Sequence, residues 1–195
     1  MKTDFYKCIK GLSKGEYKEK SSKFLSFAHP ARSENEIKLL LSTYKKEYFD
    51  ARHICYAYIL GTENEVLKSS DAGEPNGTAG LPILNQLRSF EVKNVLLVVV
   101  RYFGGTKLGA SGLVHAYKTA AHEALRQAEL VLLPITFELS FSFPYLKMNE
   151  VMKWAKDHGA TILSQEFTNN ECEMRISALR SLEKALQDKM INWQG

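Results

Sequence analysis

The feature that most constrains this chain is a glycine-rich stretch, residues 70–117, in which two loops bracket one apolar segment. More than half of the chain's twelve glycines lie in it. The first loop covers residues 71–80 and the second covers residues 101–112. Glycine is disfavoured in regular structure but is used where φ must be positive or where a ligand must approach the main chain. The stretch is therefore the best candidate for a binding site.

The segment between the loops predicts the innermost strand of a sheet. Residues 95–100 are six consecutive valines and leucines, a pattern typical of a strand buried on both faces. We expect a helix before it, over residues 79–89, and a second helix that begins at Ser111 and packs an alanine-rich face against the sheet. A strand, a glycine loop and a helix in succession place free amides and a positive helix end at one point, which favours anions.

The N-terminal part before this stretch also contains recognisable elements. Helical spacing of apolar residues behind Ser33, a suitable N-cap, predicts a helix that ends near Phe49. Runs rich in β-branched and aromatic residues predict strands, at residues 16–29 (one or two strands), 53–60 and 66–69.

From about residue 134 the pattern becomes that of a separate small domain. Its expected elements are strand 135–143, helix 147–158, strand 161–168, a turn at Asn169 and Asn170, strand 171–179 and helix 181–190. This β-α-β-β-α order is the start of a ferredoxin-like unit. The last strand of such a unit would begin near Ile191, so we expect either that the chain stops before this strand or that the strand is short. The whole chain is thus predicted to be an α+β protein with domains at 1–132 and 133–195.

Composition narrows the class of protein. A hydrophobic content of 45% and a charged content of 25% are ordinary for a globular chain. The longest apolar run is too short to cross a membrane, and the N-terminus has no apolar signal segment. Three widely spaced cysteines predict neither a disulfide framework nor a zinc ribbon. We expect a cytoplasmic protein with no membrane partner, and the sequence predicts no oligomeric state.

Charge is unevenly distributed. Residues 1–132 hold 19 Lys and Arg against 14 Asp and Glu, whereas residues 133–195 hold 7 against 8, within a net charge of +4. The basic excess of the first domain is compatible with a nucleic-acid or phosphate partner, although it is too small to require one.

Charged side chains accompany both loops. In the binding hypothesis, Arg101, Lys107 and the amides of residues 104–112 hold a phosphate or a nucleic-acid backbone, while Asp71 and Glu74 orient a hydroxyl, a metal or a basic group. The candidate ligand-binding or nucleic-acid-binding residues are Arg52, His53, Asp71, Glu74, Thr78, Arg101, Tyr102, Gly104, Gly105, Lys107 and Gly109. Tyr102 and Phe103 are candidates for stacking on a base. In the alternative interpretation, the loops are tight turns held by an internal Asp71–Arg101 ion pair.

Several chemical classes are not indicated. The second loop lacks the Gly-Lys-Ser/Thr of a phosphate-binding NTPase loop, and the first is not a dinucleotide-binding fingerprint. His53 and Cys55 lie two apart on a predicted strand, a spacing that allows a metal site with Asp71 or Glu74 but is more typical of a packed strand. We therefore expect no metal and no cofactor, and we assign no catalytic residue.

The two loops carry the residues of a known family. At residues 51–57, 71–82 and 98–117 the sequence resembles the IMPACT family, in its bacterial YigZ-like two-domain branch. The resemblance implies an N-terminal domain like the second domain of a small-subunit ribosomal protein and a ferredoxin-like C-terminal domain resembling the last domain of elongation factor G. Both likenesses point toward translation. The eukaryotic relatives are translation regulators that bind a partner in the amino-acid-starvation kinase pathway and lack this C-terminal domain.

The sequence departs from the family pattern at three positions. Ala72 stands where the family usually repeats an aspartate, Ser111 where a glycine is usual and His115 where a basic residue is common. The loss of one carboxylate argues against a mechanism that needs two adjacent carboxylates at residues 71 and 72.

Three functional hypotheses follow. The first is a translation-associated regulator whose cleft between the loops binds RNA, the ribosome or a translation-associated protein. The second is an enzyme that acts on a small phosphorylated or peptide-like substrate in the same cleft, with Asp71, Glu74 or His53 as acid/base groups. The third is a protein-binding module, which predicts an exposed apolar patch instead of a charged cleft.

Overall fold

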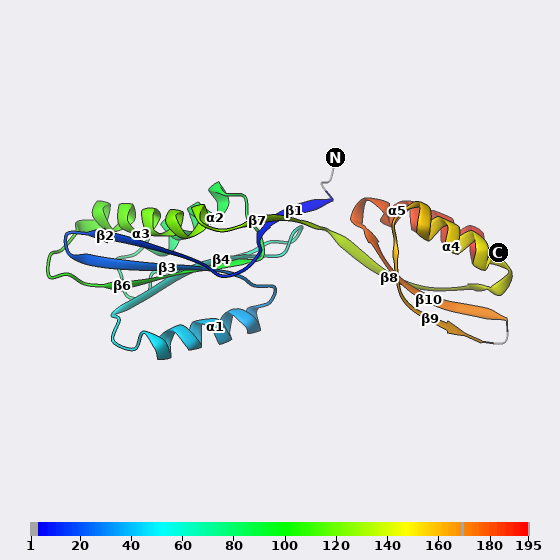
Figure 1. The fold of residues 1–195 in the computed structure, drawn as a ribbon, viewed down its shortest axis with the longest axis horizontal. Coiled ribbons are helices and arrows are strands. Elements are labelled where there is room, and N and C mark those ends of the chain that lie inside the picture. Colours follow the sequence, from blue (N-terminus) through cyan, green and yellow to red (C-terminus); the bar gives the residue numbers. More distant parts are fainter. Residues whose placement is uncertain (1–3, 169, 195) are drawn as a thin grey trace. The chain divides into compact units, whose positions relative to one another are not determined.

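The computed structural model describes residues 4–168 and 170–194 and divides into two compact units. One unit is Lys7–Leu133, and the other combines the residues before Lys7 with those from Pro134 onward. Each unit has its own sheet with helices packed on it (Figure 1). The predicted mixed α+β architecture is thus present.

A five-stranded antiparallel sheet forms the larger unit, with the strand order β2-β3-β6-β4-β5. Its strands are β2 (Ser13–Glu19), β3 (Ser22–Pro30), β4 (His53–Leu60), β5 (Val66–Ser70) and β6 (Val95–Tyr102). β6 occupies the centre, and its residues from 95 to 101 are all buried. The aliphatic run therefore becomes the innermost strand, as its pattern predicts.

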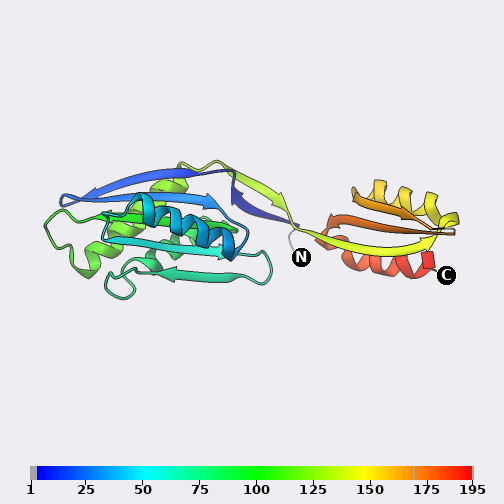
Figure 2. The same ribbon diagram turned by 90° about the horizontal axis from the view of Figure 1, so that it is seen from below.

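Helices cover both faces of this sheet. α2 (Gly80–Ser89) and α3 (Gly109–Arg126) lie on one face and α1 (Glu34–Glu47) lies on the other (Figures 1 and 2). The hydroxyl of Ser33 accepts a hydrogen bond from the Glu36 amide, so the predicted N-cap is present. α3 begins at Gly109, two residues before the predicted start.

Small residues allow α3 to approach the sheet closely. Four of its buried residues are alanines, namely Ala116, Ala120, Ala121 and Ala124. The Ser26 hydroxyl donates to the Ala120 carbonyl at 2.6 Å, and the Ser13 hydroxyl donates to the Ala124 carbonyl at 2.7 Å. The helix that follows the second glycine loop is therefore held firmly on its scaffold.

A two-stranded ribbon was not foreseen from the sequence. It consists of β1 (Phe5–Ile9) and β7 (Leu130–Pro134). Each strand has five residues, and more than 120 residues separate them, so no local turn signal marks the pair.

The smaller unit has a three-stranded antiparallel sheet with the order β8-β10-β9. Its elements are β8 (Thr136–Pro144), η1 (Tyr145–Lys147), α4 (Met148–Asp157), β9 (Thr161–Phe167), β10 (Glu171–Leu179), η2 (Arg180–Leu182) and α5 (Glu183–Gln194). The predicted β-α-β-β-α order is present. Of the predicted turn at residues 169 and 170, Asn169 lies outside the described residues.

Of the two expectations for the end of this unit, a short strand near Ile191 is not observed among the described residues. Residues 183–194 form the single helix α5. Leu186 and Trp193, seven residues apart, lie on one side of that helix and are both buried. The Trp193 ring stacks on Phe141 with centroids 5.8 Å apart. Burial of this large aromatic ring favours continuation of the helix.

Candidate functional site

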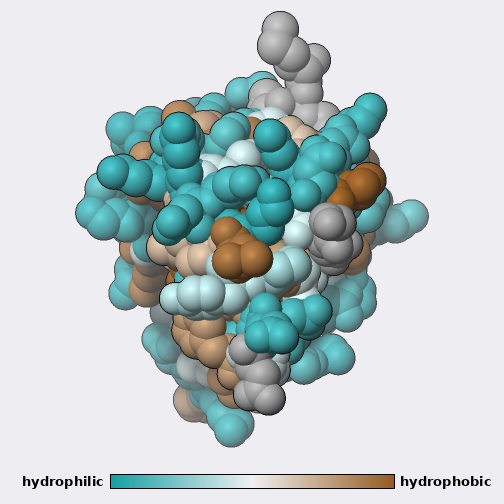
Figure 3. Space-filling view, turned by 90° about the vertical axis from the view of Figure 1, so that its right-hand side faces the viewer, coloured by the Kyte–Doolittle hydropathy of each residue, from teal (hydrophilic) through white to brown (hydrophobic). Residues whose placement is uncertain are grey.

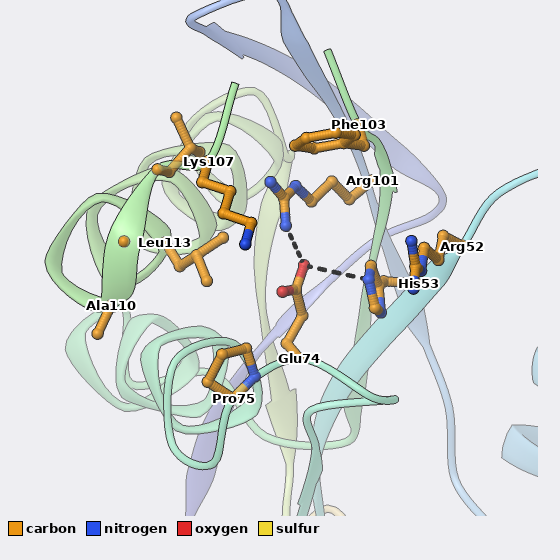
Figure 4. Close-up of a pocket in the computed structure, with 11 residues that line it drawn as sticks. Arg52, His53, Glu74, Pro75, Arg101, Phe103, Lys107, Ala110 and Leu113 are labelled. Carbon is orange, nitrogen blue, oxygen red and sulfur yellow. Dashed lines mark hydrogen bonds and ion pairs between the residues drawn. The ribbon is translucent and has the colours of Figure 1, made fainter. Parts of the chain in front are cut away.

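A pocket of about 430 Å³ lies where the two glycine loops meet in the larger unit. Its walls come from the start of β4, the first loop, the end of β6 and the first turns of α3 (Figure 4). The lining residues are Arg52, His53, Glu74, Pro75, Arg101, Phe103, Lys107, Leu108, Gly109, Ala110 and Leu113.

A buried ion pair forms the floor of the pocket. The Arg101 guanidinium donates from Nη1 to Glu74 Oε1 at 2.6 Å, and the two side chains are only 6% and 3% exposed. Tyr117, from α3, donates its hydroxyl proton to the same oxygen at 2.8 Å. Phe24 and Phe103 each lie against the guanidinium, with ring centroids 5.5 and 5.6 Å from it. Arg101 thus pairs with Glu74, and the Asp71–Arg101 ion pair of the alternative interpretation is not formed.

Asp71 instead organises the first loop. Its carboxylate accepts hydrogen bonds from the amides of Gly77, Ala79 and Gly80 at 2.8 to 2.9 Å. Burial acts to raise the pKa of Asp71, but these three amides outweigh it and hold the pKa below its usual range. The Asp71 carbonyl also accepts from the Glu74 amide, which brings Glu74 to the pocket floor.

His53 is oriented by the main chain of the same loop. Its Nδ1 lies 2.9 Å from the Ala72 carbonyl oxygen, so Nδ1 is the nitrogen that carries a proton. The other ring nitrogen, Nε2, lies 3.9 Å from Glu74 Oε1 (Figure 4). His53 therefore presents Nε2 at the edge of the buried ion pair.

Cys55 lies beneath the pocket and has no exposed surface. Its sulfur is 3.0 Å from the Asp71 carbonyl oxygen and 3.3 Å from the Tyr117 hydroxyl. Burial raises the pKa of the thiol to about 12, so it stays protonated and is no nucleophile. Residues 4–168 and 170–194 contain no cluster of three or more His, Cys, Asp or Glu side chains that could bind a metal ion.

Two further cations line the pocket. Arg52 and Lys107 are exposed, and neither has an ion-pair partner among the described residues. The Lys107 ammonium points into the pocket toward the Glu74 carboxylate (Figure 4). Because Glu74 balances Arg101, these two charges give the pocket a positive excess.

The first turn of α3 adds free backbone donors to the wall. No side chain caps this helix at Leu108, and no acidic residue occupies its first turn. Gly109 has φ +71°, a conformation that favours glycine, and so it lets the chain turn into the helix. The amides of the first turn of a helix have no partner within the helix.

Five of the predicted site residues do not line the pocket, namely Asp71, Thr78, Tyr102, Gly104 and Gly105. The Thr78 hydroxyl donates to the Pro75 carbonyl at 2.7 Å, and the Tyr102 hydroxyl donates to Asp50 at 2.9 Å. A Cβ on Gly104 would lie 2.0 Å from the Ser21 carbonyl carbon. These residues shape the loops.

The sequence did not single out the side chains of Pro75, Leu108, Ala110 or Leu113, which complete the wall, or that of Tyr117, which supports the floor. For Leu108 and Ala110 it predicted a role of the main-chain amides alone. Apolar residues of this kind resemble ordinary core positions in a sequence. For Tyr117, its place at the end of the IMPACT-like segment was the one available signal.

The smaller unit has an apolar hollow at the end of its sheet, lined by Pro144, Tyr145, Leu146, Phe167, Thr168 and Asn170. Leu146 is 93% exposed and Phe167 is 59% exposed. On the face seen in Figure 3, hydrophobic residues form small patches among hydrophilic ones. Exposed apolar side chains are the feature that the protein-binding hypothesis predicts. Among the described residues, no helix is both long and apolar enough to cross a membrane.

Comparisons with known proteins agree with the motifs. Residues 20–125, which include both glycine loops, match the family model of the Impact N-terminal domain. The chain is 36% identical to IMPACT family member YvyE of Bacillus subtilis over 65% of this chain and 58% of YvyE. It is 41% identical to IMPACT family member YigZ of Escherichia coli over 55% of this chain and 54% of YigZ. The matched part of the chain thus spans little more than half of either relative.

A solved crystal structure of a hypothetical protein has a similar fold over nearly the whole chain. It aligns with a TM-score of 0.74 and 26% identity, and the alignment covers 98% of this chain and 93% of that one. The similarity therefore includes both units. The match of the Impact N-terminal domain over more than half of the residues, in agreement with the IMPACT relatives, establishes that the chain belongs to the IMPACT family.

Proposed function

We propose that the pocket between the glycine loops binds phosphate groups of single-stranded RNA and that the protein acts in translation, in the cytoplasm. The observation that carries the proposal is a pair of cations at one pocket, Arg52 and Lys107, that have no ion-pair partner in the described part of the chain. Lysine and arginine contacts with phosphates supply most of the affinity of sequence-independent RNA binding.

An aromatic ring beside these cations supports RNA over other anionic ligands. Phe103 lines the pocket and is 49% exposed. Stacking of a base on an exposed aromatic ring contributes about 1–3 kcal/mol and tolerates any sequence. A phosphate near Arg52 and Lys107 with its base on Phe103 is the arrangement we infer.

Family resemblance supports the link to translation. We infer that the larger unit is like the second domain of a small-subunit ribosomal protein. We also infer that the smaller unit is ferredoxin-like and resembles the last domain of elongation factor G. The ribosome and ribosome-bound RNA are accordingly the natural setting for the proposed contact.

Variants of the two free cations test the proposal. Fluorescence anisotropy with a labelled single-stranded RNA should show that the double variant Arg52→Ala, Lys107→Ala binds at least about tenfold more weakly. The slope of log affinity against log salt concentration should also become shallower, by the equivalent of roughly two phosphate contacts. Arg101 is unsuitable for this test because its removal would leave Glu74 buried without its partner.

A matched control removes the same charge elsewhere. Lys68 on β5 and Lys118 on α3 are exposed and do not line the pocket. The variant Lys68→Ala, Lys118→Ala should bind RNA nearly as the parent does. Equal binding by the parent and the Arg52, Lys107 variant, or no RNA binding by the parent, would refute the proposal.

Acid/base catalysis in the pocket is less favoured. The Asp71 carboxylate is engaged by three amides, and the Glu74 carboxylate is held by Arg101 and Tyr117. Because these partners already hold both carboxylates, we infer that Asp71 and Glu74 have structural roles. Of the three acid/base candidates this leaves His53, and the Glu74 oxygen that lies 3.9 Å from its Nε2 already accepts from Arg101 and Tyr117.

A further inference from the structure

We propose that the pocket recognises a phosphomonoester, the phosphate at the end of an RNA or on a mononucleotide, in preference to the internal phosphodiesters of a chain. This inference rests on the proposed function and specifies its ligand. It is carried by an unsatisfied donor on the pocket floor together with the free start of α3.

The unsatisfied donor is Arg101 Nε. This atom is buried and has no hydrogen-bond partner among the described residues, although the side chain is 6% exposed and lines the pocket. A buried donor left without a partner costs about 1–3 kcal/mol. Phe103, which covers the guanidinium, is itself half exposed, so a ring that turns outward onto a base uncovers Nε for a phosphate oxygen.

A second set of donors faces the same space. Gly109 and Ala110, in the first turn of α3, line the pocket together with Lys107. This turn carries no side-chain cap and no acidic residue. Free amides and the positive end of an 18-residue helix form an anion-binding site. Arg101 and the start of α3 thus lie on opposite walls of the same pocket (Figure 4).

The number of negative charges and of acceptor oxygens favours a phosphomonoester as the ligand of this pocket. A phosphomonoester carries about −1.5 to −2 charges at pH 7 and presents three acceptor oxygens. An internal phosphodiester carries one charge. Arg52 and Lys107 supply two positive charges that no ion pair among residues 4–168 and 170–194 compensates, and this matches the charge of the monoester.

The form of the pocket also favours a chain end. Its floor is closed by the Arg101–Glu74 pair, and its volume of about 430 Å³ is in the range of small-molecule sites. An internal phosphate carries a nucleotide on each side that the pocket must accommodate, whereas a terminal phosphate carries one. The terminal phosphate therefore lies at the floor and its base lies on Phe103.

Three forms of one internally labelled oligonucleotide test the preference. They carry a 5′-phosphate, a 3′-phosphate or hydroxyls at both ends, and their affinities for the full chain are compared by anisotropy. At least one phosphorylated form should bind about tenfold more tightly than the hydroxyl form, equivalent to about 1.4 kcal/mol. Competition by AMP and UMP identifies a mononucleotide as ligand, and failure of both to compete assigns the site to RNA ends.

A charge placed at the start of α3 provides the decisive variant. Ala110→Glu puts a carboxylate in the first turn, where it stabilises the helix but repels a phosphate. It should abolish the preference for the phosphorylated end. Val114→Glu adds the same charge one turn later, at an exposed position that does not line the pocket, and should retain the preference.

The outcomes separate this inference from the proposed function. If all three oligonucleotides bind equally and the Arg52, Lys107 variant weakens each of them, RNA binding stands and the preference for an end is wrong. If phosphorylated ends bind more tightly but Ala110→Glu changes nothing, the preference lies elsewhere and the assignment to this pocket is wrong. If no oligonucleotide binds, both proposals fail.

Discussion

At the scale of single residues, Glu74 is a carboxylate held in the interior by an ion pair. It is almost completely buried, and one oxygen accepts from both Arg101 and Tyr117. Paired buried charges contribute little net stability, but removal of one partner leaves an uncompensated charge in the interior. The buried pair therefore keeps Arg101 in place against Phe24 and Phe103.

Glu74→Ala should lower the free energy of unfolding by about 3–5 kcal/mol because it leaves the Arg101 guanidinium buried without a counter-ion. Urea titration followed by circular dichroism measures the change. As a control, Glu129→Ala removes an exposed carboxylate that pairs with Lys10 in the same unit and should leave the stability nearly unchanged. Equal effects of the two variants would contradict the structural role of Glu74.

At the scale of elements, the first glycine loop acts as the N-terminal support of α2. Ala79, at the N-cap of α2, offers no side-chain hydrogen bond. Asp71 supplies the missing acceptor from eight residues earlier, through the amides of Ala79 and Gly80. The loop and the helix therefore form one hydrogen-bonded unit, and Glu74 is carried within it.

Asp71→Asn should destabilise the protein at neutral pH by about 1–2 kcal/mol, the usual effect of losing a charged acceptor at a helix start. The folded-state pKa of Asp71 is depressed, so the unfolded chain binds its proton first as pH falls. The stabilising effect is thus complete above a pH of about 4 and is lost below it. Urea titrations of parent and variant should differ at pH 7 and converge toward pH 2. A difference that does not change with pH would contradict this role.

The second glycine loop is supported by close contact with another turn. Gly104 passes so near the main chain of Ser21 that no side chain fits. Its amide donates to the Ser22 hydroxyl at 3.2 Å. The turn between β2 and β3 and the loop after β6 are therefore packed together, which positions Lys107 and the start of α3.

At the scale of the whole molecule, every residue that lines the pocket belongs to the larger unit. β1 and β7 pair as a separate ribbon close to the limits of that unit. A shortened chain that ends at Pro134 keeps both strands of the ribbon. We expect it to contain all of the proposed RNA site.

That shortened chain should remain folded and bind single-stranded RNA within about threefold of the full chain, a difference below about 0.7 kcal/mol. Circular dichroism verifies the fold and anisotropy measures the affinity. A well-folded shortened chain with tenfold weaker binding would show that residues after Pro134 contribute to RNA contact, and the site would need to be extended to the smaller unit.

Much of the architecture could be predicted from local patterns. The buried strand β6, the capped helix α1 and strand β4 follow from period and capping, because their signals lie within short windows of the chain. The ribbon of β1 and β7 and the helical end of α5 could not be predicted. Both depend on contacts between distant residues, such as Trp193 with Phe141.

For the candidate site, the sequence by itself determined that two glycine loops flank a buried strand and that charged residues accompany them. Only the tertiary structure decided the roles within that set. It pairs Arg101 with Glu74 and not with Asp71. Of the cations that line the pocket, it leaves Arg52 and Lys107 without an ion-pair partner among the described residues. The physical reason is that charge pairing depends on distance in space. The turns of both loops set those distances through main-chain hydrogen bonds, and the types of the charged residues alone do not reveal them.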